Sequence, residues 1–139
     1  MNREGLSIKG LVDEFTTAIR AMTPNQISGV FKRVLLCVKV RDTAAAIDML
    51  KPHLADDGYV VSAQNGLNEN LIAEMIGEDR TIGAFINFGA SYHGPDNILF
   101  GACSKVVVGE IGGEITPRFQ KFHKELQAFE PNAIATNNV

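Results

Sequence analysis

Between residues 34 and 88, short apolar runs alternate with segments that carry a helical pattern, and this alternation limits the possible folds more than any other feature of the chain. The runs are Val34–Val38, Tyr59–Ala63 and Thr81–Phe88. The first is apolar without alternation, which is typical of a strand buried on both faces, as in a parallel sheet. The order strand, helix, strand, helix, strand predicts right-handed βαβ units and a parallel sheet.

Residues that typically cap or end helices predict two helices between these strands. Asp42 can cap the first helix, and Pro52 should end or kink it. Asn68 can cap the second, and Gly77 supplies its stop. Gly58 is expected to break the chain before the second strand. The apolar stripe of the first helix consists of Ala46, Ile47, Leu50 and Leu54.

The segments on either side of this region are less regular. Over residues 6–19 the apolar positions fit either a helix or a short hairpin, and periodicity leaves both open. After a loop rich in turn residues, Ile98–Ala102 and Lys105–Val108 predict two strands in an antiparallel hairpin. Thr116 followed by proline predicts the start of a last helix, by the same pattern as Thr23 followed by proline.

Composition narrows the class of protein. The 139 residues are 45% hydrophobic and 21% charged, which is ordinary for one globular domain. Thirteen Lys and Arg against 16 Asp and Glu give a net charge of −3, which argues against a nucleic-acid surface. No apolar run approaches the ~18 residues of a membrane span, and the start lacks an export signal. We expect Cys37 and Cys103 to be reduced core residues of a cytoplasmic protein.

Polar residues that follow strands are the candidates for binding, because ligands of open α/β sheets bind beyond the carboxyl ends of the strands. Lys39 follows Val34–Val38 and Asn65 follows Tyr59–Ala63, so both should face one crevice at two helix N-termini. A cation beside an amide suits a nucleotide phosphate and ribose, or a small carboxylate. A solvated lysine and a plain Gln-Asn-Gly turn explain the same spacing equally well.

Other kinds of site find little support. His53, His93 and His123 are scattered, with no Cys or carboxylate at ligand spacing, so we expect no metal site. The sequence contains no Gly-x-Gly-x-x-Gly, no P-loop and no Gly-x-Ser-x-Gly.

Several stretches resemble the ketopantoate reductase family, also called 2-dehydropantoate 2-reductase. They are VLLCVKVRDT (Val34 to Thr43), SAQNGL (Ser62 to Leu67), IGAFINFGASYHGPDNILFG (Ile82 to Gly101) and VVVGEIGGEITPRF (Val106 to Phe119), the last similar to the end of that family's nucleotide-binding domain. The resemblance runs from about Gly5 to Val139. It implies an α/β, Rossmann-like open sheet with parallel core strands and a terminal antiparallel hairpin, and it favours a hairpin over residues 6–19.

The resemblance also implies a function: an NADPH-dependent oxidoreductase that reduces a 2-oxo acid, ketopantoate to pantoate in the namesake reaction of pantothenate biosynthesis. Lys39 matches a family lysine that lines the cofactor site. Asn65 matches an asparagine that touches both the cofactor ribose and the substrate. Gly89, at the end of the predicted third strand, matches a position whose backbone approaches the cofactor. The family's proton-donating lysine matches no residue here, so no catalytic residue is assigned.

The sequence departs from the family pattern at both ends. The family's first strand, glycine-rich phosphate turn and first helix have no counterpart here, and neither has its helical second domain. We therefore expect residues 1–139 to be a single partial NADP-binding domain with little or no activity of its own. A non-catalytic module that binds nucleotide or forms oligomers is the alternative. Without the first strand, the apolar edge of Val34–Val38 should recruit another chain, which predicts a homodimer or a local rearrangement.

Overall fold

The computed structural model describes residues 5–11 and 13–139, apart from the side chains of residues 102–104. The predicted burial of Cys103 therefore lies outside the described part of the chain. Within the described residues, no helix is both long enough and apolar enough to cross a membrane.

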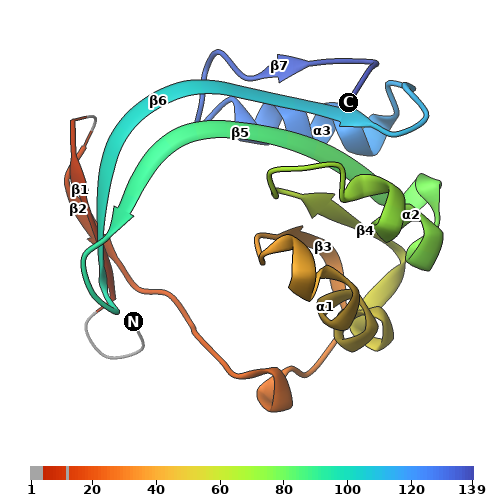
Figure 1. The fold of residues 1–139 in the computed structure, drawn as a ribbon, viewed down its shortest axis with the longest axis horizontal. Coiled ribbons are helices and arrows are strands. Elements are labelled where there is room, and N and C mark those ends of the chain that lie inside the picture. The colour runs from red at the N-terminus through yellow and green to blue at the C-terminus, as the bar shows by residue number, and fades with distance from the viewer. Residues whose placement is uncertain (1–4, 12) are drawn as a thin grey trace. The chain divides into compact units, whose positions relative to one another are not determined.

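The chain forms two compact units. The larger unit holds residues 28–86 and 105–139, and the smaller one holds the segment up to residue 27 together with residues 87–104. Two long strands, β5 (Thr81–Tyr92) and β6 (Asn97–Glu110), have one part in each unit (Figure 1).

Parallel strands form the centre of the larger unit, as the sequence predicts. β3 (Phe31–Leu36), β4 (Leu54–Ser62) and the start of β5 are parallel neighbours. Leu36 lies opposite Ser62, so the carboxyl ends of β3 and β4 are level with each other. The sheet continues through β6 to the short strand β7 (Ile134–Ala135), which is parallel to β6.

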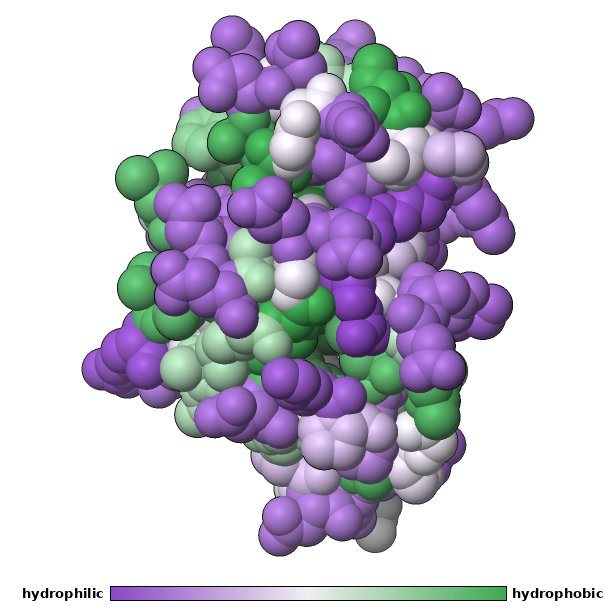
Figure 2. All heavy atoms as spheres, turned by 90° about the vertical axis from the view of Figure 1, so that its right-hand side faces the viewer, coloured by the Kyte–Doolittle hydropathy of each residue, from purple (hydrophilic) through white to green (hydrophobic). Residues whose placement is uncertain are grey.

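Helices cover both faces of these strands. α1 (Thr43–Leu50) and α2 (Glu69–Ile76) pack on one face, where Leu36, Ala46, Ile47, Val60, Ile72 and Ile76 form the buried core. α3 (Pro117–Leu126) lies on the other face, where Arg33 sits over the Phe122 ring and Arg118 over the Tyr59 ring. On the side of the molecule at the right of Figure 1, hydrophilic side chains dominate, with small hydrophobic patches between them (Figure 2).

Local signals place the helix ends largely as predicted. Asp42 directly precedes α1, but its side chain makes no capping hydrogen bond, contrary to the prediction. α1 gives way to a 3₁₀ turn at Lys51–His53, so Leu54 begins β4 instead of ending the helix. Gly77 has a φ of +102° and ends α2. Thr116 caps α3 by accepting a hydrogen bond from the Phe119 N–H (3.2 Å).

In the smaller unit, β1 (Leu6–Gly10) and β2 (Phe15–Thr17) form an antiparallel hairpin, with Leu6 opposite Thr17. β1 is also parallel to β6, with Ile8 opposite Ile98. The hairpin over residues 6–19 is thus confirmed. The helix start predicted at Thr23 amounts to one 3₁₀ turn, Pro24–Gln26.

The prediction that Val34–Val38 is buried on both faces is wrong. β3 ends at Leu36 and is the last strand of its sheet, with β4 as its neighbour. Its alternate residues Val34 and Leu36 pack on the α1 side, whereas Leu35 points to the opposite face and is 53% exposed. Cys37 lies beyond the strand and is exposed, not in the core.

The predicted hairpin of Ile98–Ala102 and Lys105–Val108 is also wrong, because both segments belong to one continuous strand, β6. The antiparallel hairpin is formed by β5 and β6, which run in opposite directions (Figure 1). Its turn is closed by the His93 N–H, which donates to the Asn97 carbonyl (3.0 Å).

The prediction that Gly58 breaks the chain before the second strand is wrong, because Gly58 lies within β4. The β3–β4 pairing changes register there, with Phe31 opposite Leu54 and Arg33 opposite Tyr59. A Cβ on Gly58 would come within 2.8 Å of the Phe31 carbonyl oxygen, so this irregular stretch requires a glycine.

Candidate functional site at the ends of β3 and β4

The loops that follow β3 and β4 lie side by side because the two strands are parallel neighbours. Just beyond the paired ends, the Ala63 N–H donates to the Leu36 carbonyl (2.9 Å). The first loop runs through a 3₁₀ turn, Val40–Asp42, into α1, and the second runs through Gln64–Leu67 to α2. Each loop therefore leads to a helix N-terminus, where backbone N–H groups lack partners within the helix.

The buried side chain of Gln64 joins the two loops. Its amide nitrogen donates to the Val38 carbonyl (2.7 Å) and to the Thr43 hydroxyl oxygen (2.9 Å). Its amide oxygen accepts from the Ser62 hydroxyl at 3.5 Å. Gln64 is 5% exposed and Thr43 is fully buried. Sequence reasoning missed both residues, because it interpreted Gln-Asn-Gly as a turn and did not single out Thr43.

Lys39 and Asn65 directly follow the two residues that this bridge connects, Val38 and Gln64. Lys39 precedes the 3₁₀ turn, and its carbonyl accepts from the Asp42 N–H (2.8 Å). Both side chains are exposed. Among the described residues, the Lys39 ammonium has no ion-pair partner and the Asn65 amide has no hydrogen-bond partner. The structure thus brings the two predicted residues onto adjacent loops with their polar groups free.

Asn68 adds an unused donor at the same helix start. Its side chain makes no capping hydrogen bond, although the sequence predicts a cap. The residue is 4% exposed, and its Nδ2 has no hydrogen-bond partner among the described residues. This nitrogen lies beside Gly66, where a Cβ would come within 3.5 Å of it. An unsatisfied buried donor costs about 1–3 kcal/mol, so a hydrogen-bond acceptor here fits the residues present.

A pocket of about 360 Å³ opens beside the second loop, within the larger unit. It is lined by Gln64, Gly66, Leu67, Glu69, Ala84, Phe85, Val107, Asn138 and Val139. Its walls are therefore the loop after β4, the start of α2, the strands β5 and β6, and the residues after β7. A few polar groups on an otherwise apolar wall are typical of small-molecule sites.

The sequence predicts Gly89 at the end of a strand, but the structure places it inside one. β5 runs to Tyr92, so Gly89 is inside the strand and not at its end. The strand continues because it pairs with β6 there, and a Cβ on Gly101 of β6 would come within 3.4 Å of the Gly89 carbonyl oxygen. Gly89 belongs to the smaller unit, whereas Lys39 and Asn65 belong to the larger one.

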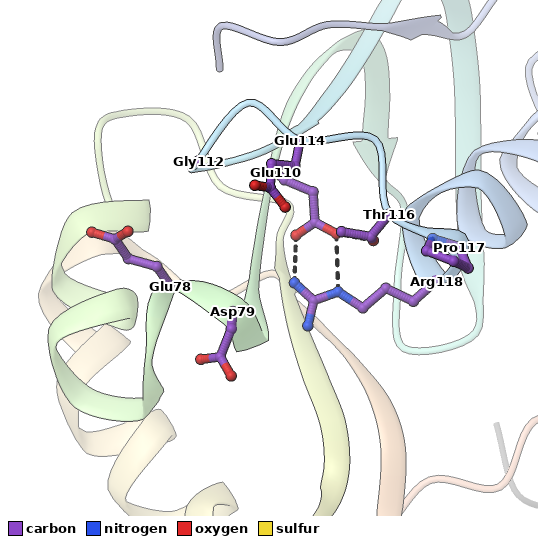
Figure 3. A pocket seen from close by; sticks show the side chains of 8 residues that line it. All are labelled: Glu78, Asp79, Glu110, Gly112, Glu114, Thr116, Pro117 and Arg118. Atoms are coloured by element: carbon purple, nitrogen blue, oxygen red, sulfur yellow. Dashed lines mark hydrogen bonds and ion pairs between the residues drawn. The ribbon is translucent and has the colours of Figure 1, made fainter.

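A second pocket, of about 450 Å³, lies at the opposite end of the parallel strands, where β5 begins. Figure 3 shows the Arg118 guanidinium facing the Glu110 carboxylate there. Arg118 Nε donates to Glu110 Oε1 (2.9 Å), its Nη2 donates to Oε2, and the Thr116 hydroxyl donates to Oε1 (2.6 Å). The carboxylate is buried and its oxygens are occupied, so Glu110 has a structural role.

The structure gives no support for a metal site or for a reactive cysteine among the described residues. Among the described residues, no group of three or more His, Cys, Asp or Glu side chains could hold a metal ion. Partial burial raises the pKa of the Cys37 thiol, which disfavours the reactive thiolate.

Comparisons with known proteins agree on one family. The family model described as "Ketopantoate reductase PanE/ApbA" matches residues 1–113. The 2-dehydropantoate 2-reductase of Aquifex aeolicus (strain VF5) is 28% identical over 119 residues, which cover 84% of this chain and 38% of that protein.

Solved structures share the fold. The 2-dehydropantoate 2-reductase from Geobacter metallireducens GS-15 matches with a TM-score of 0.86 at 21% identity, over 99% of this chain and 46% of that one. A D-mandelate dehydrogenase solved with NADH and anilino(oxo)acetate matches with a TM-score of 0.84 at 15% identity, over 96% and 44%. The chain thus spans less than half the length of each of these relatives.

Proposed function

Because the chain belongs to the ketopantoate reductase PanE/ApbA family, we propose that its larger unit forms part of the nicotinamide-nucleotide site of a reductase that acts on a 2-oxo acid. The preferred cofactor is NADPH and the proposed substrate is ketopantoate, reduced to pantoate. One observation supports this most directly. Gln64 ties together two loops at the carboxyl ends of parallel strands. Each loop presents a polar side chain, Lys39 or Asn65, that has no partner among the described residues.

The residues at this site would bind and orient the cofactor and the substrate. When bound, the reduced nicotinamide supplies the hydride that converts the 2-oxo carbon to an alcohol. The Lys39 ammonium is suited to a phosphate or carboxylate oxygen, and the Asn65 amide can both donate to and accept from ribose hydroxyls or the substrate. The Asn68 amide offers one more donor at the start of α2.

Binding of nucleotide by the chain is the direct test. We expect Lys39→Ala and Asn65→Ala each to weaken NADPH binding about tenfold or more, since hydrogen bonds to charged groups contribute about 1.5–3 kcal/mol. Lys124→Ala and Asn132→Ala, which remove exposed side chains elsewhere in the larger unit, should leave the affinity unchanged. Calorimetric titrations with NADPH and with NADH measure both affinity and cofactor preference. Equal affinities in all four variants would contradict the proposed site.

No residue of the chain is assigned the role of proton donor, so we propose that residues 1–139 bind nucleotide with little or no turnover. The measurement is NADPH oxidation in the presence of ketopantoate. Turnover in the range of typical enzymes, about 1–10³ s⁻¹, would contradict this. Nucleotide binding without turnover also fits a non-catalytic binding module. A longer chain that keeps Lys39 and Asn65 separates the two: NADPH oxidation with ketopantoate by that chain supports the reductase, and its absence supports the binding module.

We further propose that the chain forms a homodimer in solution through the free edge of β3. Within the described residues β4 is the only strand that pairs with β3. Leu35 on this strand is 53% exposed and Val40 just beyond it is 55% exposed. Unpaired strand edges with apolar side chains readily pair with another chain.

A further inference from the structure

We infer that Gln64 is a positioning residue for the nucleotide: its hydrogen bonds to Val38 and Thr43 set the spacing of the Lys39 and Asn65 loops. The inference rests on the proposed function of this site. Because Gln64 is 5% exposed and its polar atoms already have protein partners, its amide is engaged in holding the loops. Its contribution to nucleotide binding would therefore be indirect.

The sheet itself does not hold the two loops. β3 ends at Leu36 and β4 at Ser62. In the part of the chain that the structure describes, the bond from the Ala63 N–H to the Leu36 carbonyl is the last backbone hydrogen bond between them. Beyond that point, the Gln64 side chain spans from its own loop to the Val38 carbonyl and on to the Thr43 hydroxyl at the start of α1. One side chain thus joins its own loop to the backbone of the first loop and to the Thr43 side chain at the start of α1.

The two binding residues stand directly next to the anchored atoms. Lys39 follows Val38, whose carbonyl accepts the Gln64 bond, and Asn65 follows Gln64 itself. A shift of either anchor would move the neighbouring side chain with it. Small displacements of this kind are costly at a binding site, because the ligand's groups must meet both loops at once.

The chemistry of the amide is as important as its shape. The two hydrogens of the Gln64 nitrogen serve two acceptors, and neither methionine nor a carboxylate can replace them. Gln64→Glu keeps the shape but sets a negative charge against the Val38 carbonyl oxygen. Protonation of the introduced carboxyl restores one donor, so the affinity of this variant should recover as the pH falls, whereas that of Gln64→Met should not.

The first experiment is NADPH titration of the full chain at a temperature where every variant is folded by circular dichroism. We expect Gln64→Met and Gln64→Glu to bind about tenfold more weakly or worse at pH 7.5, with recovery at lower pH for Gln64→Glu alone. The control is Thr81→Val at the first residue of β5, opposite Val60 of β4, which removes a buried hydroxyl that donates to the Gly77 carbonyl (2.9 Å). If Gln64→Met and the control lose equal affinity, or neither loses any, the positioning role is overturned.

The second experiment needs no nucleotide and separates this inference from the proposed function. The Asp42 N–H is bonded to the Lys39 carbonyl and reports on the first loop, while the Ile72 N–H is bonded to the Asn68 carbonyl and reports on α2. In Gln64→Met we expect amide exchange at Asp42 to accelerate at least tenfold and exchange at Ile72 to stay unchanged. If Asp42 exchange does not change, the inference falls. If it accelerates but the wild-type chain binds no NADPH, the proposed function fails and the loop-holding role stands.

Discussion

At the scale of single residues, the Glu110 carboxylate is buried against the partly buried guanidinium of Arg118. The Glu110 side chain is 5% exposed and accepts from the guanidinium and from the Thr116 hydroxyl. The Arg118 guanidinium also stacks over the Tyr59 ring, 5.5 Å from its centroid. The pair therefore joins the end of β6 to α3 and to β4.

Removal of one partner should destabilise the protein more than removal of both. Arg118→Met leaves the Glu110 carboxylate buried without its cation, and we expect a loss of about 3–5 kcal/mol in the free energy of unfolding. The double variant Glu110→Leu with Arg118→Met should lose much less, because no charge remains buried. Urea unfolding of the two single variants and the double variant provides the measurement. A double variant as unstable as the sum of the single ones would show that the pair is not coupled.

At the scale of elements, glycines let the residues after β7 lie close to the sheet. A Cβ on Gly109 of β6 would come within 2.6 Å of the Thr136 carbonyl oxygen, which is backbone. A Cβ on Gly83 of β5 would come within 2.8 Å of the Val139 methyl carbons, which belong to a side chain. Backbone atoms cannot move aside as cheaply as a side chain can, so the two positions should tolerate a methyl group differently.

A series of alanine substitutions tests this difference. We expect Gly109→Ala to lower the free energy of unfolding by about 1–3 kcal/mol through overpacking, and Gly83→Ala to lower it by less. Gly112→Ala is the control, because a Cβ there meets no atom within 4 Å. Thermal unfolding ranks the three variants. The reverse order for Gly109 and Gly83 would mean that the segment after β7 is held less firmly than its contacts indicate.

At the scale of the whole molecule, two ion pairs of β3 make stability depend on pH. Arg33 bonds to Glu125 of α3 (2.6 Å), and Lys32 bonds to Asp57 of β4 (3.0 Å). Burial by itself would lower the pKa of Arg33, but its hydrogen bonds to Glu125 and Tyr59 outweigh this and raise it. The same contacts lower the pKa of Glu125 and of Asp57 below their ordinary values, chiefly through the hydrogen bonds from Arg33 and Lys32.

The sign of the pH effect follows from these directions. A carboxylate whose pKa is lower in the folded state stabilises the fold above its unfolded pKa, about 4, and loses this contribution as the pH falls through the folded value. We expect the free energy of unfolding to decline below about pH 5. Glu125→Gln should flatten part of that decline, and Glu114→Gln, at an exposed site in the loop before α3, serves as the control. Identical pH profiles for the wild type and Glu125→Gln would rule out this contribution.

The free edge of β3 sets the expected oligomeric state. We expect light scattering to give the mass of a dimer, and Leu35→Lys to shift the mass toward the monomer, because a charge on an edge strand opposes pairing with another chain. Leu11→Lys, at an apolar position that is 85% exposed in the smaller unit, is the matched control. A monomeric wild-type chain would contradict the proposed dimer.

Local patterns in the sequence were enough for the end of α2, the start of α3 and the order of strands and helices between residues 34 and 88. Gly77, Thr116 and the proline after it act within one turn of backbone, so their effect can be recognised without knowing the rest of the fold. The placement of Lys39 and Asn65 on adjacent loops could be predicted because the ends of parallel strands follow from strand order alone, and their role in binding stays a proposal. Their partner Gln64 was not found, because its hydrogen bond to Val38 joins residues 26 positions apart.

The sequence by itself determined the α/β class, the parallel strands of the larger unit and, through its resemblance to a family, the hairpin over residues 6–19. These depend on periodicity and on motifs that are contiguous in the chain. Only the tertiary structure decided that residues 97–110 form one strand, that β3 is an exposed edge and that Gly89 lies inside β5. The physical reason is that the length and burial of a strand depend on which neighbour pairs with it and which helix covers it, and both are set by residues distant in sequence.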